Sequence, residues 1–553
     1  MTAARTPIVS VVVPVYNAMP YLEQTLASVA RQSIGTEAVE IVAVDDGSTD
    51  GSGAFLDAWA ARHPGAVTVI HQEASGGPSR PRNVGLDHAT GTYVFFLDGD
   101  DCLGPQALER LVAMAERNGS DTVLAKLVGV GRTIRKEVNE VFAKNVDRAD
   151  PAVVYWTLMP FKLFRREMIE KHGLRFPEHM RISEDQHFVA RAYLRSSVIS
   201  ILADYDCYYL VGRGDKGNIT AGGLDYPTMV TQADELVGLV TELTEPGDLR
   251  DRLITRHAKV ELLRRFDRRF LNDTEDERKA VVELARPYAE RWVTPGVFAR
   301  LDVAERLRVH CVREGLLDEL ASIVAWDAAG RPGKTAVRDG RLYAAAPYPP
   351  GDSAAYAELC DVTDEVVRVS PRRRVEELTW QGSVVALAGY AYLDQVDTDA
   401  LTTEAVLRHR GSGRQVAVPV THEETPHLTV SRGRETYDYG RAGFRVAIDL
   451  AAVADGGPLD PGTWEIGLRC SVRDLTVTGA LGGALGAGIP RQADRRTLAL
   501  ESSAGSRPYT VGLDIQGSQL TVTLKVQPDP PSTFTRVKRK LGRVARVPRQ
   551  RKR

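Results

Sequence analysis

The first part of the chain, from Ile8 to about Ala203, alternates short apolar runs with amphipathic stretches. Ser10–Val15 and Ile41–Val44 are nearly continuous apolar runs, which is typical of strands that are buried on both faces. Val67–His71 and Tyr93–Leu97 follow at similar spacing. This alternation predicts an α/β domain built around a buried sheet.

Helices are expected between these strands. Tyr21–Arg31 and Ala54–Arg62 are amphipathic enough to be crossover helices. A third helix is expected after Gly104, because Pro105 suits the first helical position and the pair Asn118-Gly119 suits the end of a helix.

The pattern becomes helical from about Tyr226 to Ala329 and then changes again. Apolar residues recur at intervals of three and four over Asp251–Phe270 and Asp302–Ile323, which predicts a helical linker domain. Beyond Gly340 the pattern is that of short strands separated by turn residues. The expected strands include Ser383–Leu387, Val416–Val420, Gly443–Ile448, Trp464–Leu468 and Leu520–Val526.

Four segments follow from this pattern. We expect an α/β domain over residues 1–225, a helical linker over 226–335, an all-β region of immunoglobulin-like sandwiches over 336–527 and a tail over 528–553. Within the last two segments, Gly479–Gly488 is expected to be a mobile loop and Pro528–Pro531 a stiff spacer.

The composition is that of a globular protein. With 43% hydrophobic and 26% charged residues, the 553-residue chain is neither disordered nor fibrous, and it has room for about three domains. No apolar run approaches the ~18 residues of a membrane-spanning helix, and no export signal is recognisable. The five cysteines are scattered without CxxC spacing, which argues against a disulfide framework and a structural zinc site. We therefore expect a cytoplasmic protein.

The net charge of −2 conceals a strongly basic tail. Arg536–Arg553 holds ten Lys or Arg residues and no acidic residue, so the rest of the chain carries −12. Such a tail is typical of contact with a polyanion, either an anionic membrane or a nucleic acid, and the alternative is a solvated terminus. Its apolar residues recur at helical intervals and it has no aromatic residue after Phe534. These features favour a peripheral membrane contact over base stacking.

Acidic residues follow two of the expected strands. Asp45 and Asp46 come directly after the second strand, and Asp98, Asp100 and Asp101 follow the fourth. Ligands of open α/β sheets bind at the carboxyl ends of the strands. The spacing of Asp98 and Asp100 places two hard oxygen ligands near one divalent cation, as a bridge to a diphosphate requires.

Acidic residues of this part of the chain are also compatible with two other kinds of metal site. The residues from Asp46 to Asp57 match the ligand positions of a calcium loop, but the segment follows a strand, not a helix, and Gly53 stands where an apolar residue is usual. Glu184-x-x-His187 could be half of a di-metal helix site, but no second half is present. Neither alternative is preferred.

Five motifs, in this order, resemble those of the family 2 glycosyltransferases. They are Val13-Pro14-Val15-Tyr16-Asn17, Val44-Asp45-Asp46-Gly47-Ser48-Thr49-Asp50, Pro81-Arg82-Asn83-Val84-Gly85, Phe96-Leu97-Asp98-Gly99-Asp100-Asp101 and Ser183-Glu184-Asp185. The resemblance covers roughly residues 8–220 and implies a GT-A fold, which is Rossmann-like and binds a nucleotide-sugar. It also implies a divalent metal, Mn²⁺ or Mg²⁺, and inversion at the anomeric carbon.

The same resemblance implies roles for individual residues. Pro14 and Tyr16 would line the nucleobase pocket, with Asp46 near the uracil and Asp45 close by. Arg82 would lie beside the nucleotide, although Ser79-Arg80-Pro81 departs from the small residues usual before it.

The resemblance also implies which residues bind the metal and take part in the reaction. Asp98 would face the ribose and the metal, and Asp100 would bind the metal. Asp185 would be the catalytic base, because an inverting transfer needs a carboxylate to take the proton of the attacking hydroxyl. Glu184 would support Asp185 or bind the acceptor. Arg213 and Lys216 resemble the basic loop that closes over the diphosphate.

The order of domains resembles the wall teichoic acid glycosyltransferases, whose C-terminal portion forms homotrimers. The sequence lacks the QxxRW motif and the membrane helices of processive synthases. We therefore expect the transfer of single sugars, most simply an N-acetylhexosamine from a UDP-sugar to a hydroxyl of a cell-wall glycopolymer. The alternatives are a capsule or exopolysaccharide transferase acting on a lipid-linked acceptor, and a non-catalytic sugar-binding protein. A dinucleotide-dependent oxidoreductase is excluded because no GxGxxG follows the first strand.

Overall fold

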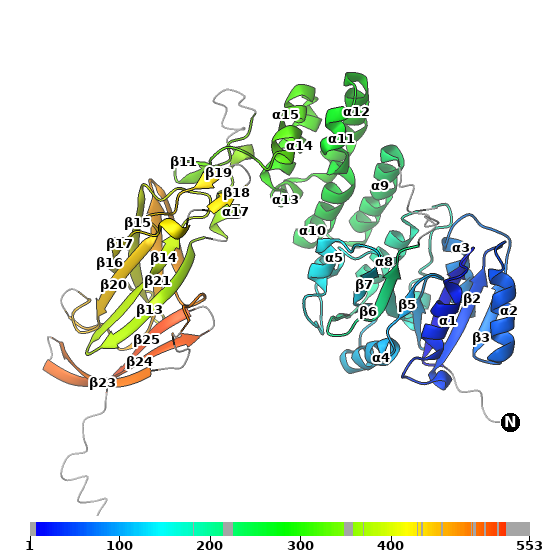
Figure 1. Ribbon diagram of the computed structural model, residues 1–553, viewed down its shortest axis with the longest axis horizontal. Coiled ribbons are helices and arrows are strands. Elements are labelled where there is room, and N and C mark those ends of the chain that lie inside the picture. Colours follow the sequence, from blue (N-terminus) through cyan, green and yellow to red (C-terminus); the bar gives the residue numbers. More distant parts are fainter. Residues whose placement is uncertain are drawn as a thin grey trace, which may run out of the picture. The chain divides into compact units, whose positions relative to one another are not determined.

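The computed structural model describes residues 7–180, 182–213, 225–347 and 358–526, with short gaps in the last range at 369, 429, 433–434, 455–456, 488, 490–493, 503–504 and 517–518 (Figure 1). The chain divides into two compact units. The first comprises Met1–Leu301 with Arg308–Leu317, and the second comprises Asp302–Leu307 with Asp318–Arg553.

A seven-stranded sheet forms the centre of the first unit, with the strand order β3-β2-β1-β4-β8-β6-β9. Its strands are β1 (Val9–Val15), β2 (Val39–Asp45), β3 (Val67–His71), β4 (Tyr93–Phe96), β6 (Thr122–Ala125), β8 (Lys162–Arg165) and β9 (Ile199–Leu202). β1 to β4 pair in parallel, whereas β8 runs antiparallel to both of its neighbours. The four apolar runs expected to be strands are all present, and the α/β prediction is confirmed.

Helices follow the parallel strands as expected: α1 (Leu22–Ala30), α2 (Ser52–Arg62), α3 (Ser79–His88) and α4 (Ala107–Asn118). Helix α4 begins two residues later than expected, so Pro105 precedes it, and it ends at Gly119 with φ of 63°. A smaller sheet joins β5 (Cys102–Leu103), β10 (Tyr208–Val211) and β7 (Leu127–Val130). The remaining helices of this part are α5 (Lys136–Val141), α6 (Pro151–Val154), α7 (Arg166–Lys171) and α8 (Glu184–Arg195).

One glycine sets how closely α3 approaches the sheet. A Cβ atom on Gly85 would lie 2.3 Å from Val12 Cγ1, so no other residue fits without displacing the helix from β1. The close approach fixes the first turns of α3, which carry Arg82, against the end of the buried strand.

The linker region is helical, as expected, but the long helix expected over Asp251–Phe270 is interrupted. Helix α10 (Asp248–His257) passes into a π-helical turn over Ala258–Leu262. Arg256 Nη1 and Glu261 Oε1 are 2.9 Å apart, a pairing five residues along the chain that matches the π-helical spacing. The apolar residues of this segment recur regularly every three or four positions, but the buried Arg256–Glu261 pair lies where the helix departs from that period.

The other linker elements are α9 (Tyr226–Leu243), α11 (Arg268–Asn272), α12 (Glu275–Trp292), α13 (Pro295–Phe298), α14 (Val303–Glu314) and α15 (Leu317–Ala328). The helix expected over Asp302–Ile323 is therefore two helices. They separate at Gly315, whose φ of 71° lies in the left-handed region.

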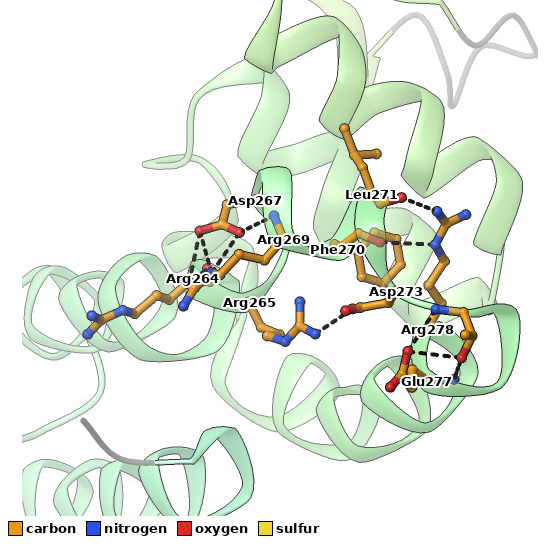
Figure 2. Close-up of polar contacts among 10 residues, drawn as sticks. Arg264, Arg265, Asp267, Arg269, Phe270, Leu271, Asp273, Glu277 and Arg278 are labelled. Atoms are coloured by element: carbon orange, nitrogen blue, oxygen red, sulfur yellow. Dashed lines mark hydrogen bonds and ion pairs between the residues drawn. The ribbon is translucent and has the colours of Figure 1, made fainter. Parts of the chain in front are cut away.

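Polar contacts hold α11 against the start of α12 (Figure 2). Arg278 donates from Nε to the carbonyl of Phe270 at 3.0 Å and from Nη2 to that of Leu271 at 2.6 Å. Thr274 and Glu277 form a capping box at the first turn of α12. These bonds satisfy backbone groups that helix ends leave without partners.

The second unit is mostly β-structure, as expected. A four-stranded sheet orders β13 (Arg372–Gln381), β14 (Val384–Tyr392), β20 (Gly443–Asp449) and β17 (Thr421–Glu423). A larger antiparallel sheet orders β16 (Gln415–Pro419), β15 (Leu401–His409), β21 (Gly462–Val472), β25 (Gln519–Val526), β24 (Gly505–Gln516) and β23 (Asp494–Ser502), with β22 (Leu475–Ala480) paired to β21. Short strands complete the unit: β11 (Ala336–Arg338), β12 (Arg341–Tyr343), β18 (Val430–Arg432) and β19 (Glu435–Tyr437).

The structure changes one expectation for the C-terminal half and leaves two untested. The loop expected to begin at Gly479 begins later, because Gly479 and Ala480 pair with β21. The spacer at Pro528–Pro531 and the basic tail lie outside the described residues. In the described ranges we find no helix that combines the length and the apolar character needed to cross a membrane.

Candidate active site

A cavity of about 640 Å³ opens at the carboxyl ends of β1, β2 and β4, which is the size and position usual for a small-molecule site in an α/β sheet. It brings together residues that are far apart in the sequence. Nine of the candidate residues line it: Pro14, Tyr16, Asp46, Arg82, Asp98, Asp100, Glu184, Asp185 and Arg213.

Two candidate residues are not placed in this lining. Asp45 is paired in register with His71 on β3, and its Oδ2 lies 2.9 Å from His71 Nδ1, while its Oδ1 accepts from the backbone N–H of Ser48. Hydrogen bonds to Asp57 and Asp45 raise the pKa of His71 above its ordinary value. Asp45 therefore holds the loop after β2 in place and does not line the cavity. Lys216 lies outside the described residues.

Tyr16 and Asp46 form one side of the cavity. Tyr16 is 54% exposed, an unusually open position for a large aromatic ring in this protein. Asp46 is buried, and both of its carboxylate oxygens accept hydrogen bonds from Ser75, with Gln72 donating to Oδ1. Asp46 thus holds in place the segment after β3, which supplies Gly76 to the same wall.

The turn after β4 supplies two carboxylates. Asp98 Oδ1 accepts a 2.8 Å hydrogen bond from Arg82, and Asp100 Oδ2 lies 3.8 Å from Arg213 Nη1. Burial, together with the neighbouring Asp98 carboxylate, raises the pKa of Asp100 to about 6. Two negative charges are therefore held close together in a partly buried place, with a cation beside each.

Arg82 connects this turn to the second acidic pair. Its Nη1 donates to Glu184 Oε1 at 2.8 Å, while its Nη2 donates to Asp98. The guanidinium is buried and packs over the Phe176 ring at 5.2 Å. The two nearby carboxylates keep the pKa of Arg82 well above its ordinary value, despite its burial. Arg82 is therefore a fixed positive charge between the two acidic groups.

Glu184 and Asp185 occupy the first turn of α8. Ser183 before them has φ of 72°, a strained value for a residue with a side chain, and it turns the chain so that both carboxylates reach the cavity. Burial raises the pKa of both Glu184 and Asp185. Among the described residues, Asp185 accepts only from the N–H of Gln186, whereas Glu184 is committed to Arg82.

Helix α3 also holds the segment that leads to this acidic pair. The Asn83 side chain accepts from the N–H of Phe176 and donates to its carbonyl, both at 2.9 Å. Ser79 Oγ donates to the carbonyl of Pro177 at 2.9 Å. Helix α3 therefore holds both Arg82 and the segment that leads to Glu184 and Asp185.

Three further residues contribute to the site without having been assigned a role from the sequence. Asp101 lines the cavity and is hydrogen-bonded to Tyr208 on β10. Lys162 is buried near Asp185, and burial lowers the pKa of its amine to about 7. The sequence Asp98-Gly99-Asp100-Asp101 after β4 indicated that Asp101 lies at the same sheet edge, but the sequence assigned no site role to Tyr208 or Lys162.

Comparison with protein families gives three consecutive matches. Residues 10–173 match Glycosyl transferase family 2, residues 227–324 match the Glycosyl transferase TarS linker domain, and residues 361–479 match the TarS beta-glycosyltransferase C-terminal domain 1. The order and the positions agree with the α/β, helical and β-rich parts of the structure.

Two curated relatives share the N-terminal part. A poly(ribitol-phosphate) beta-glucosyltransferase of Bacillus spizizenii is 39% identical over 206 residues, which are 37% of this chain and 32% of the relative. The poly(ribitol-phosphate) beta-N-acetylglucosaminyltransferase TarS of Staphylococcus aureus is 35% identical over 205 residues, which are 37% of this chain and 35% of the relative. The match thus spans about a third of the length of these relatives.

Solved structures extend the likeness beyond the N-terminal part. S. aureus TarS has the same fold over 94% of this chain and 86% of its own, with a TM-score of 0.54 at 20% identity. Residues 1–349 of TarS in complex with UDP-GlcNAc match 63% of this chain and 100% of that structure, with a TM-score of 0.53 at 25% identity. This chain is homologous to the poly(ribitol-phosphate) glycosyltransferases, and its residues 10–173 belong to glycosyl transferase family 2, followed by a TarS linker domain and a TarS C-terminal domain.

Proposed function

We propose that this chain is an inverting, metal-dependent glycosyltransferase that moves single sugars from a UDP-sugar to a hydroxyl of a cell-wall glycopolymer. The observation that carries the proposal is the convergence of two carboxylate pairs, Asp98 with Asp100 and Glu184 with Asp185, on one cavity. Arg82 joins the two pairs. One pair suits the departing nucleotide and the other suits the attacking hydroxyl.

The donor is held by both ends of the cavity in this proposal. The open Tyr16 ring stacks on the nucleobase beside Pro14, and the segment held by Asp46 closes that pocket. Arg213 binds the diphosphate, since a guanidinium matches the geometry of phosphate oxygens. The complex of TarS with UDP-GlcNAc supports a UDP-sugar donor.

The carboxylate oxygens of Asp98 and Asp100 fit the ligand preference of a divalent cation. The Asp98 carboxylate is close enough to raise the pKa of Asp100, and a positive ion between them would stabilise both charges. Mn²⁺ and Mg²⁺ prefer oxygen ligands of this kind. Among the described residues no three acidic, histidine or cysteine side chains form a complete metal site, so the diphosphate and water would complete the coordination. When bound, the ion neutralises charge on the leaving diphosphate.

Asp185 is the proposed catalytic base. It has one described hydrogen bond and is free of the ion pair that occupies Glu184, so its carboxylate can accept the proton of the acceptor hydroxyl. Its raised pKa makes it a stronger base than an exposed carboxylate. Glu184 keeps Arg82 in position and borders the acceptor side.

The names of the relatives support poly(ribitol phosphate) as acceptor, and N-acetylglucosamine or glucose as the sugar. The direct experiment offers UDP- and GDP-sugars to the purified chain with Mn²⁺ and measures thermal stabilisation and hydrolysis. A donor at ~100 times its Kd should add about 2.7 kcal/mol of apparent stability. Turnover with poly(ribitol phosphate) supports the proposal. Turnover with lipid-linked oligosaccharides alone would instead assign the chain to capsule or exopolysaccharide synthesis.

We also propose that the C-terminal β region assembles the chain into a homotrimer. The architectural likeness to teichoic acid glycosyltransferases supports this, and exposed edges and faces of sheets are ready association surfaces. Light scattering of the full chain tests it: a mass three times that of the monomer is expected, and a monomer would leave acceptor binding as the role of the β region.

The basic tail is proposed to bind the inner face of an anionic membrane, which would make the chain a peripheral cytoplasmic protein. Ten cations over Arg536–Arg553, each worth on the order of 1 kcal/mol near such a surface, suffice for reversible attachment. Flotation with anionic vesicles at low salt tests it. If the full chain binds no better than a chain ending at Ser532, the membrane role is wrong.

A further inference from the structure

A closed ring of hydrogen bonds joins the turn after β4 to strand β10. The backbone N–H of Asp98 donates to the Tyr208 hydroxyl at 3.2 Å, and this hydroxyl donates to Asp101 Oδ2 at 2.7 Å. The ring closes inside the turn, where the N–H of Asp101 donates to the carbonyl of Asp98 at 3.1 Å. The backbone of the turn that carries Asp100 is thereby fixed on both sides.

The second oxygen of Asp101 extends the ring along β10. Asp101 Oδ1 accepts from the backbone N–H of Val211 at 2.7 Å. Two residues further on, Arg213 lies 3.8 Å from Asp100 and donates to the carbonyl of Asn17 at 3.0 Å. One carboxylate therefore links the turn that presents Asp100 to the strand end that presents Arg213.

Burial makes this arrangement rigid. Tyr208 is 0% exposed and Asp101 is 3% exposed, so water does not compete for their hydrogen bonds. The Tyr208 ring stacks on Phe161, with centroids 4.2 Å apart and planes 19° from parallel, and Phe161 itself lines the cavity. The hydroxyl satisfies the buried Asp101 carboxylate and the partly buried N–H of Asp98, and a phenylalanine at this position would bond to neither.

We propose that Asp101 and Tyr208 are a positioning pair that keeps Asp98, Asp100 and Arg213 in register for metal-dependent binding of the donor diphosphate. The inference rests on the proposed function. Neither residue is a catalytic residue. Both carboxylate oxygens of Asp101 accept hydrogen bonds from residues of β10, and the Tyr208 hydroxyl accepts from the backbone of the turn. Residues that orient metal ligands in this way typically contribute 10–100-fold to metal affinity.

The test measures UDP binding to the full chain by calorimetry, with and without Mn²⁺. Tyr208→Phe keeps the stacked ring and removes only the hydroxyl. Its UDP affinity in Mn²⁺ should fall at least tenfold, and its affinity without the metal should change by less than twofold. Tyr93→Phe is the matched control, because Tyr93 is also buried and donates its hydroxyl to Glu116 on α4. Tyr93 begins β4 and so lies at the end of this strand away from the cavity.

Variants of Asp101 separate positioning from charge. Asp101→Ala should lose at least as much affinity as Tyr208→Phe, because it removes the bond to Val211 as well as the ring. The double variant should bind no more weakly than Asp101→Ala, because both substitutions break the same ring. Asp101→Asn can still accept from Val211 and can donate to the Tyr208 oxygen, but the Tyr208 hydroxyl then loses its acceptor. Its loss of Mn²⁺-dependent affinity should therefore be smaller than that of Asp101→Ala, without full recovery.

Each outcome is decisive. If Tyr208→Phe lowers thermal stability as Tyr93→Phe does but leaves Mn²⁺-dependent binding unchanged, the pair is merely structural and the inference is wrong. If Tyr208→Phe does not fold, the comparison of Asp101→Asn with Asp101→Ala decides, and equal losses in both overturn the inference. Absence of UDP binding in the unchanged protein would instead contradict the proposed function.

Discussion

Arg82 Nη1 lies 2.8 Å from Glu184 Oε1, and this ion pair makes two adjacent carboxylates chemically different. Glu184 is neutralised by a buried guanidinium, whereas Asp185 next to it is not engaged by that cation's hydrogen bonds. The same guanidinium holds Asp98. The proposed donor side and the proposed acceptor side of the cavity therefore share one positive charge.

Replacing Arg82 should change the pH dependence of transfer. Its charge favours the ionised forms of Glu184 and Asp185, so Arg82→Met should raise the pKa of both further. A base with a higher pKa is protonated at higher pH, so the acidic limb of kcat/KM should move to higher pH. The measurement is a pH–rate profile with saturating UDP-sugar.

Arg82→Lys is the matched control for this effect. Lysine keeps the charge but cannot bridge two carboxylates, so the acidic limb should stay near its original pH while kcat/KM falls by roughly 10–100-fold. Identical acidic limbs in the methionine and lysine variants would show that Arg82 does not act on the base through its charge.

Asp100→Asn should remove metal-dependent donor binding. A neutral amide does not replace an anionic ligand of a divalent ion, and the raised pKa of Asp100 should be visible as loss of Mn²⁺-dependent binding when the pH falls below about 6. Calorimetry with UDP and Mn²⁺ measures both effects. Unchanged affinity in the variant would remove Asp100 from the metal site.

The linker offers a stability prediction independent of the active site. Thr274→Ala removes the capping box at the start of α12 and should cost about 1 kcal/mol. For a unit of this size, that corresponds to a decrease of roughly 1–2 °C in Tm by calorimetry. UDP affinity should not change, and a loss of affinity would show that this junction (Figure 2) communicates with the cavity.

The sequence predicted the parts of the site that depend on local order. Carboxylates that directly follow buried strands were expected at the sheet edge, and Asp98 and Asp100 are there. Asp45 and Asp46 could not be separated in this way. They are adjacent at the end of β2, and only the pairing of β2 with β3 places Asp45 opposite His71 and leaves Asp46 at the cavity.

Contacts between distant segments could not be predicted. The bridge from Arg82 to Glu184 and the ring through Tyr208 join residues that meet only in the folded sheet. The interruption of α10 was missed for a similar reason, because the apolar period of that segment is regular and the buried Arg256–Glu261 pair acts against it. Periodicity reports which face is buried, and it does not report which charges share that face.

The central claim is that Asp185 is the base of an inverting transfer in this cavity. The most direct measurement compares single-turnover transfer by the unchanged protein, Asp185→Asn and Glu184→Gln, from bound UDP-N-acetylglucosamine to poly(ribitol phosphate) in Mn²⁺. We predict that Asp185→Asn retains donor affinity and loses about 10²–10⁴-fold in rate, with a smaller loss in Glu184→Gln. Transfer at the original rate by Asp185→Asn would contradict the account.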